Sequence, residues 1–347
     1  MMTLQRLIGE NFMVPQTALW YLTDLAEFKG RQEMFTRQAP QRLKALREHA
    51  IVESAVSSNR IEGVNIDAGR VATVVFGRPL LRDRDEEEVR GYRDALNLIH
   101  QNGMDLPLDE ECILNLHRMA RGEIWDAGKY KDHDGDIIER YPDGRERVRF
   151  HTVSASGTPA SMSELVSLWR ACLQDRKVHP LLAMVAFNLD FLCIHPFRDG
   201  NGRVSRLLML LQCYQLGYDV GHFISLERLI EENKDRYYET LEASSQGWHE
   251  GTHDVWPYAN FLLYVLKAAY REFETRVGEV TEARGAKTET VQRMVESFDG
   301  DLTLGELQRA CPAVSLDMVR LVLKEMKAAG RVECLGRGPG ARWKKKR

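Results

Sequence analysis

The chain of 347 residues is long enough to bury a sizeable core and to hold more than one domain. Its formal net charge of −3 excludes a strongly basic protein, although residues 303–347 carry 11 Lys/Arg against 4 Asp/Glu, a local balance of +7 that leaves −10 for the remainder. Six cysteines without a CxxC pair argue against a disulfide framework or a zinc site. No apolar run approaches the roughly 20 residues that cross a bilayer, and Arg6 and Glu10 do not fit a signal peptide, so we expect a cytoplasmic protein without membrane contact.

Helical periodicity dominates most of the chain. The apolar spacing predicts two helices within 15–63, the second from Pro40 to about Ile61, and further helices over 83–101, 108–121, 161–175, 179–194, 203–216, 225–245 and 255–277. Residues 64–82 predict a loop-rich connection. Within the glycine-rich segment 122–160, short β-like pieces at 136–138 and 147–153 flank the turn signal Pro142-Asp143-Gly144, which predicts a β-hairpin.

The end of the chain predicts a separate basic unit. Residues 278–288, with Gly278, Gly285 and many charges, predict a linker. The expected elements beyond it are helices over 289–298, 303–311 and 315–329 and strands over 331–335 and 341–343. Helix, turn, helix and a glycine-rich basic wing follow in the order typical of a winged helix, so residues 303–347 are a candidate DNA contact. The alternatives are a module for protein contacts and a solvated basic tail.

The chemistry-bearing residues gather between two apolar segments, in His195-Pro196-Phe197-Arg198-Asp199-Gly200-Asn201-Gly202-Arg203-Val204-Ser205-Arg206. The glycines let the backbone turn and approach a ligand, and the start of the following helix favours an anion. Arg203 and Arg206, three residues apart, reach the same anion. Asp199 is a usual type of Mg²⁺ ligand beside phosphate oxygens, and His195 is a base that titrates near neutrality. The stretch predicts phosphoryl or nucleotidyl transfer; a structural histidine within a buried arginine network is the alternative.

This stretch resembles the Fic family signature HPFx[D/E]GNGRxxR at every defined position. A mostly helical body with a hairpin before the motif also resembles a Fic domain. Fic proteins transfer AMP from ATP to a hydroxyl of a target protein and release diphosphate. The resemblance therefore implies a protein adenylyltransferase, with ATP as substrate and Mg²⁺ as cofactor.

The resemblance also implies a role for individual residues. His195 is implied as the general base for a Ser, Thr or Tyr hydroxyl, and Asp199 as the Mg²⁺ ligand. Nucleotide contacts are implied for Gly200, Asn201, Gly202, Arg203, Val204, Ser205 and Arg206, and also for His151, Thr152, Val153, Ser154, Tyr237 and Tyr238. For the two tyrosines, core packing is the alternative.

A second family pattern, [S/T]xxxE[G/N], is matched by Ser58-Asn59-Arg60-Ile61-Glu62-Gly63 at the end of a predicted helix. A carboxylate at a helix C-terminus lies on the unfavourable side of the helix dipole, which suggests a partner arginine elsewhere. The resemblance implies that Ser58 and Glu62 belong to an inhibitory helix and that Glu62 pairs with Arg206. A buried arginine–carboxylate pair of this kind is expected to be bidentate.

These expectations give a mainly α protein: a Fic-domain helical bundle with a β-hairpin flap and a C-terminal winged helix-turn-helix domain. The expected divisions are 1–84 with an inhibitory helix at about 40–63, 85–277 as the catalytic core, 278–288 as a linker and 289–347 as the winged helix. The flap at 129–153 is implied to dock the target protein. Removal of AMP on the same site and a DNA-binding regulator with a secondary Fic activity are the alternatives, and self-modification and a homodimer are left open.

Overall fold

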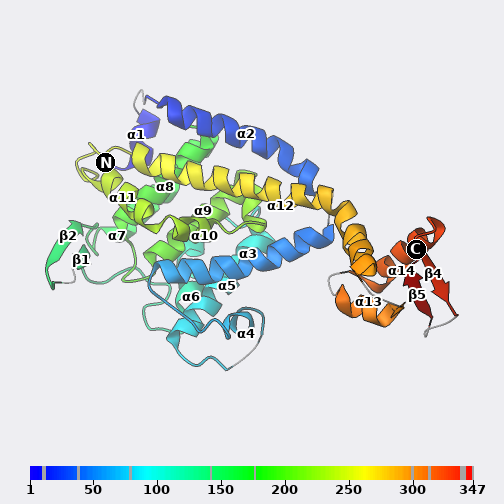
Figure 1. The fold of residues 1–347 in the computed structure, drawn as a ribbon. Helices are drawn as coiled ribbons and strands as arrows, with labels where there is room; N and C mark the ends of the chain where they lie inside the picture. Colours follow the sequence, from blue (N-terminus) through cyan, green and yellow to red (C-terminus); the bar gives the residue numbers. More distant parts are fainter. Residues whose placement is uncertain are drawn as a thin grey trace. The chain divides into compact units, whose positions relative to one another are not determined.

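The computed structural model describes residues 1–9, 13–36, 40–77, 80–140, 143–175, 177–297, 301–311, 314–336 and 341–345. The fold is mainly α, as the sequence predicts (Figure 1). Two compact units divide it, Met1–Phe273 and Glu274–Arg347. No helix of the described residues is long and apolar enough to cross a membrane.

The first unit is built from helices and one hairpin. Its elements are α1 (Thr3–Gly9), α2 (Gln16–Thr36), α3 (Pro40–Ile61), α4 (Val71–Phe76), α5 (Arg84–Asn102), α6 (Glu110–Arg121), β1 (Ile137–Arg140), β2 (Glu146–Phe150), α7 (Thr158–Asp175), α8 (Pro180–Ile194), α9 (Asn201–Gln215), a 3₁₀ turn η1 (Asp219–His222), α10 (Leu226–Glu232), α11 (Lys234–Ser245) and the start of α12 (Trp256–Ser297). The bounds of α3, α5, α6 and α8 lie within two residues of the predicted ones.

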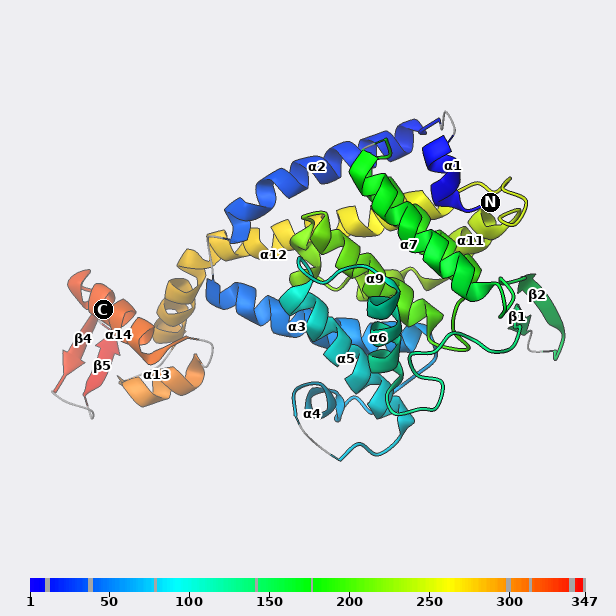
Figure 2. The same ribbon diagram turned by 180° about the vertical axis from the view of Figure 1, so that it is seen from behind.

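Helix α8 forms the centre of this unit. Every residue from Leu181 to Ile194 is buried, because α8, which is labelled in Figure 1, is largely apolar and is packed by α1, α7, α9 and α11, which Figure 2 labels from the opposite side. Pro180 occupies the first turn, where its missing N–H costs no hydrogen bond. The helix ends at His195, and α9 begins six residues later, so the polar loop between them is held between two buried helices.

Two long helices border this core. Helix α2 lies along α12, where the rings of Phe28 and Tyr270 stack with centroids 5.4 Å apart and Tyr270 Oη donates to Gln32 Oε1 at 2.7 Å (Figure 1). Helix α3 packs against α5 and α10, and its last turn meets the start of α9. This packing delivers the predicted inhibitory segment to the polar loop.

The predicted hairpin is present as antiparallel β1 and β2. Ile138 pairs with Val148 in register, and both side chains are nearly half exposed. Pro142 of the predicted turn lies outside the described residues. The hairpin therefore offers an apolar outer pair at a sheet of two strands.

Several elements differ from the sequence expectation. Helices α1 and α4 were not predicted, and the expected helix 225–245 is divided at Asn233 into α10 and α11. Residues 278–288, predicted as a linker between two units, lie within α12, which continues as helix to Ser297. The segment contains no proline, and its alanine, glutamate, lysine and arginine residues favour helix strongly enough to tolerate two glycines.

The second unit contains the end of α12, β3 (Leu302–Thr303), α13 (Leu304–Ala310), α14 (Leu316–Ala328), β4 (Val332–Leu335) and β5 (Arg342–Lys345). The strands form an antiparallel sheet in the order β3-β5-β4. Thr303 and Glu306 form a capping box that starts α13, and Leu307, Val319 and Leu323 lie in a continuous apolar core. The order of elements is that of the predicted helix-turn-helix and wing; the wing glycines at 338 and 340 lie outside the described residues.

Candidate active site

The polar loop turns at two residues with left-handed backbone conformation. His195, at the C-terminus of α8, has φ 53°, and Gly200, before α9, has φ 85°. A Cβ on Gly200 would lie 3.0 Å from Cδ of Arg121, so glycine is required both by the backbone angle and by the close approach. These two turns place His195 and the N-terminus of α9 on either side of one short loop.

Asn201 fixes the shape of the loop. Its Oδ1 accepts from Phe197 N at 2.9 Å, and its Nδ2 donates to Phe197 O at 2.7 Å. The side chain is 2 % exposed, so both ends of the amide are used inside the loop. The sequence implied a nucleotide contact for Asn201; the structure instead gives its side chain the task of holding the backbone that faces a ligand.

His117 on α6 supports the loop from beneath. Its ring stacks on Phe197 with centroids 3.7 Å apart. Gly128 N–H donates to Nδ1 at 2.9 Å, so the proton of the neutral ring is on Nε2, which donates to Asp199 O at 3.0 Å. Burial lowers the pKa of His117 to about 4, which keeps this arrangement neutral at physiological pH.

The protonation of His195 suits a general base. Its Nδ1 lies 3.3 Å from Leu192 O, and because a carbonyl only accepts, Nδ1 carries the proton and Nε2 keeps its lone pair. Burial lowers the pKa of His195 to about 4, with a smaller lowering from Lys131. The ring is therefore neutral near pH 7.

His195 lies between two pockets. The first, of about 320 Å³, is lined by Glu62 of the α3 end, Gly202, the tyrosine pair of α11 and the hairpin; its lining residues are Glu62, Ile137, Ile138, Arg149, Phe150, Leu192, Cys193, His195, Gly202, Tyr237, Tyr238, Leu241, Glu242 and Ser245. The second, of about 430 Å³, is lined by His195, Phe197, Arg198 and residues 131–136. His195 is thus shared by both pockets, one on the side of Glu62 and the tyrosine pair and one on the side of residues 131–136.

Asp199 is held by an arginine that the sequence did not indicate. Arg121 Nη1 donates to Asp199 Oδ2 at 2.6 Å, and Arg203 Nη2 lies 3.8 Å from Asp199 Oδ1. Burial alone would raise the pKa of Asp199, but the two guanidinium groups outweigh it and lower the pKa. Asp199 is therefore ionised near neutrality, and 59 % of its side chain is exposed.

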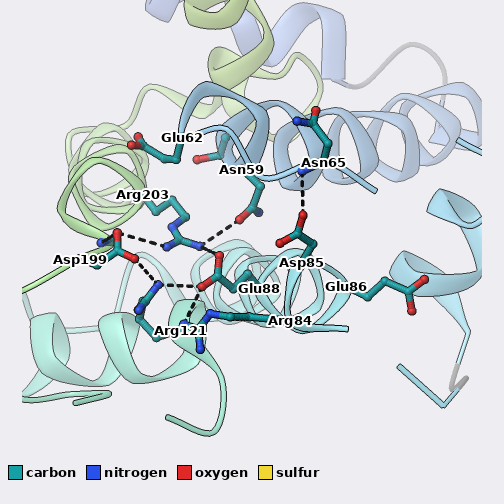
Figure 3. A network of polar contacts seen from close by, with 12 residues as sticks. Asn59, Glu62, Asn65, Arg84, Asp85, Glu86, Glu88, Arg121, Asp199 and Arg203 are labelled. Atoms are coloured by element: carbon teal, nitrogen blue, oxygen red, sulfur yellow. Dashed lines mark hydrogen bonds and ion pairs between the residues drawn. The ribbon is translucent and has the colours of Figure 1, made fainter. Parts of the chain in front are cut away.

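Arg203 belongs to the same network (Figure 3). Its Nη1 donates to Glu88 Oε2 at 2.6 Å and to Asn59 Oδ1 at 3.2 Å. The side chain is 1 % exposed, so it reaches the loop from the core and not from the solvent. Glu88 of α5 sets the position of Arg203, and Asn59 ties it to α3.

Arg206 is joined to the end of α3. Its Nε and Nη2 donate to Ser58 Oγ and Ser58 O, both at 2.8 Å, and Nη2 also donates to Glu62 Oε1 at 2.8 Å. The structure thus brings Ser58, Glu62 and Arg206 together as predicted. The expected bidentate pair is wrong, however, because one carboxylate oxygen meets one guanidinium nitrogen. Burial alone would lower the pKa of Arg206, but the Glu62 carboxylate raises it.

Glu62 also reaches over the loop glycine. A Cβ built on Gly202 would lie 2.2 Å from Glu62 Oε1. Glycine at position 202 therefore leaves the space that the carboxylate uses at the first turn of α9. Any anion that approaches this helix N-terminus meets Glu62 in its place.

Other residues implied by the sequence lie elsewhere. Val204 is fully buried, and Ser205 Oγ donates to Gly202 O at 2.8 Å, so both side chains pack inside the helix bundle. His151, Thr152, Val153 and Ser154 do not line the cavity. Instead Thr152 Oγ1 accepts from Lys131 Nζ at 2.7 Å and the segment packs on the loop 133–136. The tyrosine pair Tyr237 and Tyr238 does line the cavity, and Tyr237 is at the same time a core residue.

The residues present fit a divalent cation only together with a ligand that brings its own oxygens. The loop supplies a single carboxylate, and among the described residues no group of three His, Cys, Asp or Glu is placed to hold a metal ion. Mg²⁺ commonly takes one or two carboxylates and completes its shell with substrate phosphates and water. Asp199, exposed and ionised beside an anion-favouring helix N-terminus, fits this mode.

Residues 107–213 match the model of the Fic/DOC family. Protein adenylyltransferase Fic of Drosophila grimshawi is 24% identical over 231 residues, which are 65% of this chain and 43% of that protein. The chain thus spans less than half the length of this curated relative.

Two solved structures share the fold. A Fic family protein of Desulfovibrio desulfuricans G20 has a TM-score of 0.65 and 22% identity, over 96% of this chain and 97% of its own. A Fic domain containing signaling protein of Bacteroides thetaiotaomicron has a TM-score of 0.62 and 22% identity, over 74% of this chain and 97% of its own. The motif, its helical setting and the family match agree over residues 107–213, which therefore form a Fic/DOC domain.

Proposed function

We propose that this protein transfers AMP from ATP to a hydroxyl side chain of a target protein and releases diphosphate. The observation that carries the proposal is the place of His195, a neutral base that lines both of the pockets beside the loop. A transferase needs this placement, because the base must reach an acceptor on one side and the donor on the other.

The cavity suits a nucleotide. Its volume of about 320 Å³ and its aromatic wall of Tyr237 and Tyr238 match a base, while Gly202 and the N-terminus of α9 offer an anion site. Arg206, once free of Glu62, supplies a buried positive charge at the same place. The relatives' name supports ATP as the donor.

The residues of this chain divide the chemistry between them. Nε2 of His195 takes the proton of the acceptor hydroxyl as the oxygen attacks the α-phosphate, and diphosphate leaves with the electron pair of the broken bond. Arg203, Arg206 and the backbone N–H groups at the start of α9 stabilise negative charge on the phosphates. Asp199 would hold Mg²⁺, which, when bound, neutralises charge on the phosphate oxygens.

With Glu62 in this position, the active site is inhibited. It pairs with Arg206 and lies over Gly202, so the guanidinium and the helix N-terminus are both engaged by a carboxylate of this chain. A phosphate group would compete for the same two partners. Low basal transfer follows, and loss of Glu62 raises it.

The acceptor segment is proposed to dock at the hairpin. Ile138 and Val148 give it an exposed apolar pair, and within the described part of the chain β1 and β2 pair with no third strand. A peptide strand added at one edge gains main-chain hydrogen bonds and places its side chains toward the pocket that His195 lines.

The direct test uses the full chain with Glu62→Gly to remove the inhibition. The variant is incubated with a cell lysate, Mg²⁺ and ATP labelled in the α-phosphate. Protein-bound label is expected with Glu62→Gly and not with Glu62→Gly/His195→Ala, while ATP labelled in the γ-phosphate gives none. Label from the γ-phosphate, or equal labelling without His195, would refute AMP transfer.

Removal of AMP from a modified protein is a second candidate, favoured by the position of Glu62 in the cavity beside His195. A carboxylate at this place could orient a water for attack on the phosphodiester. Wild type would then release AMP from a pre-labelled target and Glu62→Gly would not. Equal release by both proteins contradicts this function.

DNA binding by the second unit is supported by the outer face of α14. Arg320, Lys324 and Lys327 are exposed there at helical spacing, and Arg342 and Lys344 are exposed on β5. Such clusters attract phosphates with a strong dependence on salt. The test is binding of the full chain to duplex DNA from low to high salt, with Lys324→Glu/Lys327→Glu as the comparison; equal binding by both proteins contradicts the contact.

A further inference from the structure

A single buried carboxylate organises three arginines beside the loop (Figure 3). Glu88 Oε1 accepts from Arg84 Nη2 at 2.8 Å and from Arg121 Nη1 at 2.7 Å, and Oε2 accepts from Arg203 Nη1 at 2.6 Å. Glu88 is 3 % exposed, so the ion pairs form in a region from which water is largely excluded. Buried charges are tolerated when they are paired and hydrogen-bonded in this way.

Arg121 extends this cluster to the metal-ligand candidate. The same Nη1 that donates to Glu88 also donates to Asp199 Oδ2 at 2.6 Å. Arg121 is 5 % exposed and its Cδ lies against the position where Gly200 would carry a Cβ, so the guanidinium has little freedom to turn. Asp199, by contrast, is 59 % exposed. The buried arginine therefore holds the exposed carboxylate, and not the reverse.

We propose that Arg121, fixed by Glu88, is a positioning residue that orients Asp199 and makes divalent-cation binding dependent on the nucleotide. The inference rests on the proposed function, in which Asp199 holds Mg²⁺. Two guanidinium groups lie within 3.8 Å of the Asp199 oxygens, so a free divalent cation meets positive charge at this carboxylate. The phosphates of ATP bring the negative charge that offsets this repulsion.

The alternative is that Arg121 only closes a buried ion pair with Glu88. That role needs no contact with the loop, because Arg84 and Arg203 already supply two donors to Glu88. A purely structural arginine would influence stability and leave the cation affinity of Asp199 unchanged. The two roles are separated by measuring cation binding without any turnover.

The experiment follows Mn²⁺ binding to the full chain by electron paramagnetic resonance, with and without α,β-methylene-ATP. Wild type is expected to bind Mn²⁺ weakly alone, and the Glu62→Gly variant, in which Glu62 no longer occupies the phosphate site, is expected to bind it far more tightly with the analogue. Arg121→Gln removes the positive charge beside Asp199. A neighbouring opposite charge shifts the proton affinity of a carboxylate by roughly one to three powers of ten, so we expect this variant to bind Mn²⁺ alone about tenfold more tightly. Arg121→Lys keeps the charge and is expected to stay close to wild type.

Arg84→Gln is the matched control, because it also removes a cation from Glu88 but makes no hydrogen bond to Asp199 and acts on it only as a more distant charge. It should change the Mn²⁺ affinity much less than Arg121→Gln does, and Asp199→Asn should abolish the gain made by Arg121→Gln. Equal affinity of wild type and folded Arg121→Gln for Mn²⁺ alone overturns the inference. If Arg121→Gln does not fold, the wild-type measurement still tests the inference, because tight Mn²⁺ binding at Asp199 without nucleotide contradicts it.

Failure of the proposed function gives a different result. A protein that binds no α,β-methylene-ATP at any Mn²⁺ concentration, even with Glu62→Gly, is not an ATP-dependent transferase. The comparison of Mn²⁺ affinity in the absence of nucleotide remains valid in that case, because it depends only on Arg121 and Asp199.

Discussion

Replacing Glu62 by glycine removes the carboxylate that Arg206 shares with the end of α3. Glu62 gives the guanidinium one hydrogen bond of 2.8 Å, whereas Ser58 gives it two. Arg206 therefore keeps its place when Glu62 is lost, and its charge becomes available to a phosphate. Glycine at the end of α3 also removes a negative charge from the unfavourable end of the helix dipole, so the helix itself loses little.

The magnitude follows from that single contact. A hydrogen bond to a charged group contributes about 1.5–3 kcal/mol net, and each 1.4 kcal/mol is about a factor of ten, so kcat/KM for AMP transfer should rise about 10- to 100-fold. The lower part of the range is expected, because 29 % of the Glu62 side chain is exposed and solvent screens the pair.

The assay measures initial rates of target labelling from α-labelled ATP and, in parallel, ATP affinity by calorimetry. Arg60→Ala is the control: its exposed ion pair with Glu231 also joins α3 to α10, at 3.1 Å, but it does not contact Arg206. A similar gain from Arg60→Ala would mean that loosening α3 is sufficient. No gain in rate or affinity with Glu62→Gly would refute the inhibitory role.

Three further predictions concern the loop itself. With the pKa of His195 near 4, transfer should stay constant from neutral pH downward and fall only as pH approaches about 4; an acid limb at about 6.5 in the pH–rate profile would contradict it. Because the pKa of His195 is lower in the folded protein, the unfolded state binds more protons than the folded state between about pH 6.5 and 4. The free energy of unfolding should therefore decrease as pH falls through this window, and urea titrations at each pH measure it. Asn201→Ala leaves the buried N–H of Phe197 unpaired, so the free energy of unfolding in chemical denaturation should fall by about 1–3 kcal/mol. A fall of less than about 0.5 kcal/mol would contradict this prediction. Gly200→Ala forces a Cβ against Arg121 at positive φ and should cost about 1–2 kcal/mol or more, whereas unchanged stability would show that the turn relaxes freely.

The loop and the end of α3 were predictable because their signals are local. Gly200 and Gly63 mark backbone turns in the sequence itself, and both have positive φ in the structure. The charge of Glu62 at a helix C-terminus was itself a sign of a partner elsewhere, and that partner is Arg206. In these cases a residue type and its neighbours carry enough information to place the side chain.

The supporting network was not predictable in the same way. Glu88 follows the acidic first turn of α5 and Arg121 ends α6, and both patterns also describe solvated charges. Apart from Arg84, four residues before Glu88, their partners lie 33 to 115 residues away along the chain, and no periodicity links such positions. His117 was missed for the same reason, because one histidine on an amphipathic helix gives no sign of the ring it will stack on.

Arg203 and Arg206 are equivalent in the sequence motif, but their carboxylate partners come from different parts of the fold. Arg203 pairs with Glu88, a carboxylate of α5 that stays in place whatever the end of α3 does. Arg206 takes its carboxylate from α3 itself. A displacement of α3 therefore changes the net charge around Arg206 and leaves Arg203 neutralised. If the proposed inhibition holds, regulation through α3 acts on Arg206, while Glu88 keeps Arg203 in place beside the loop.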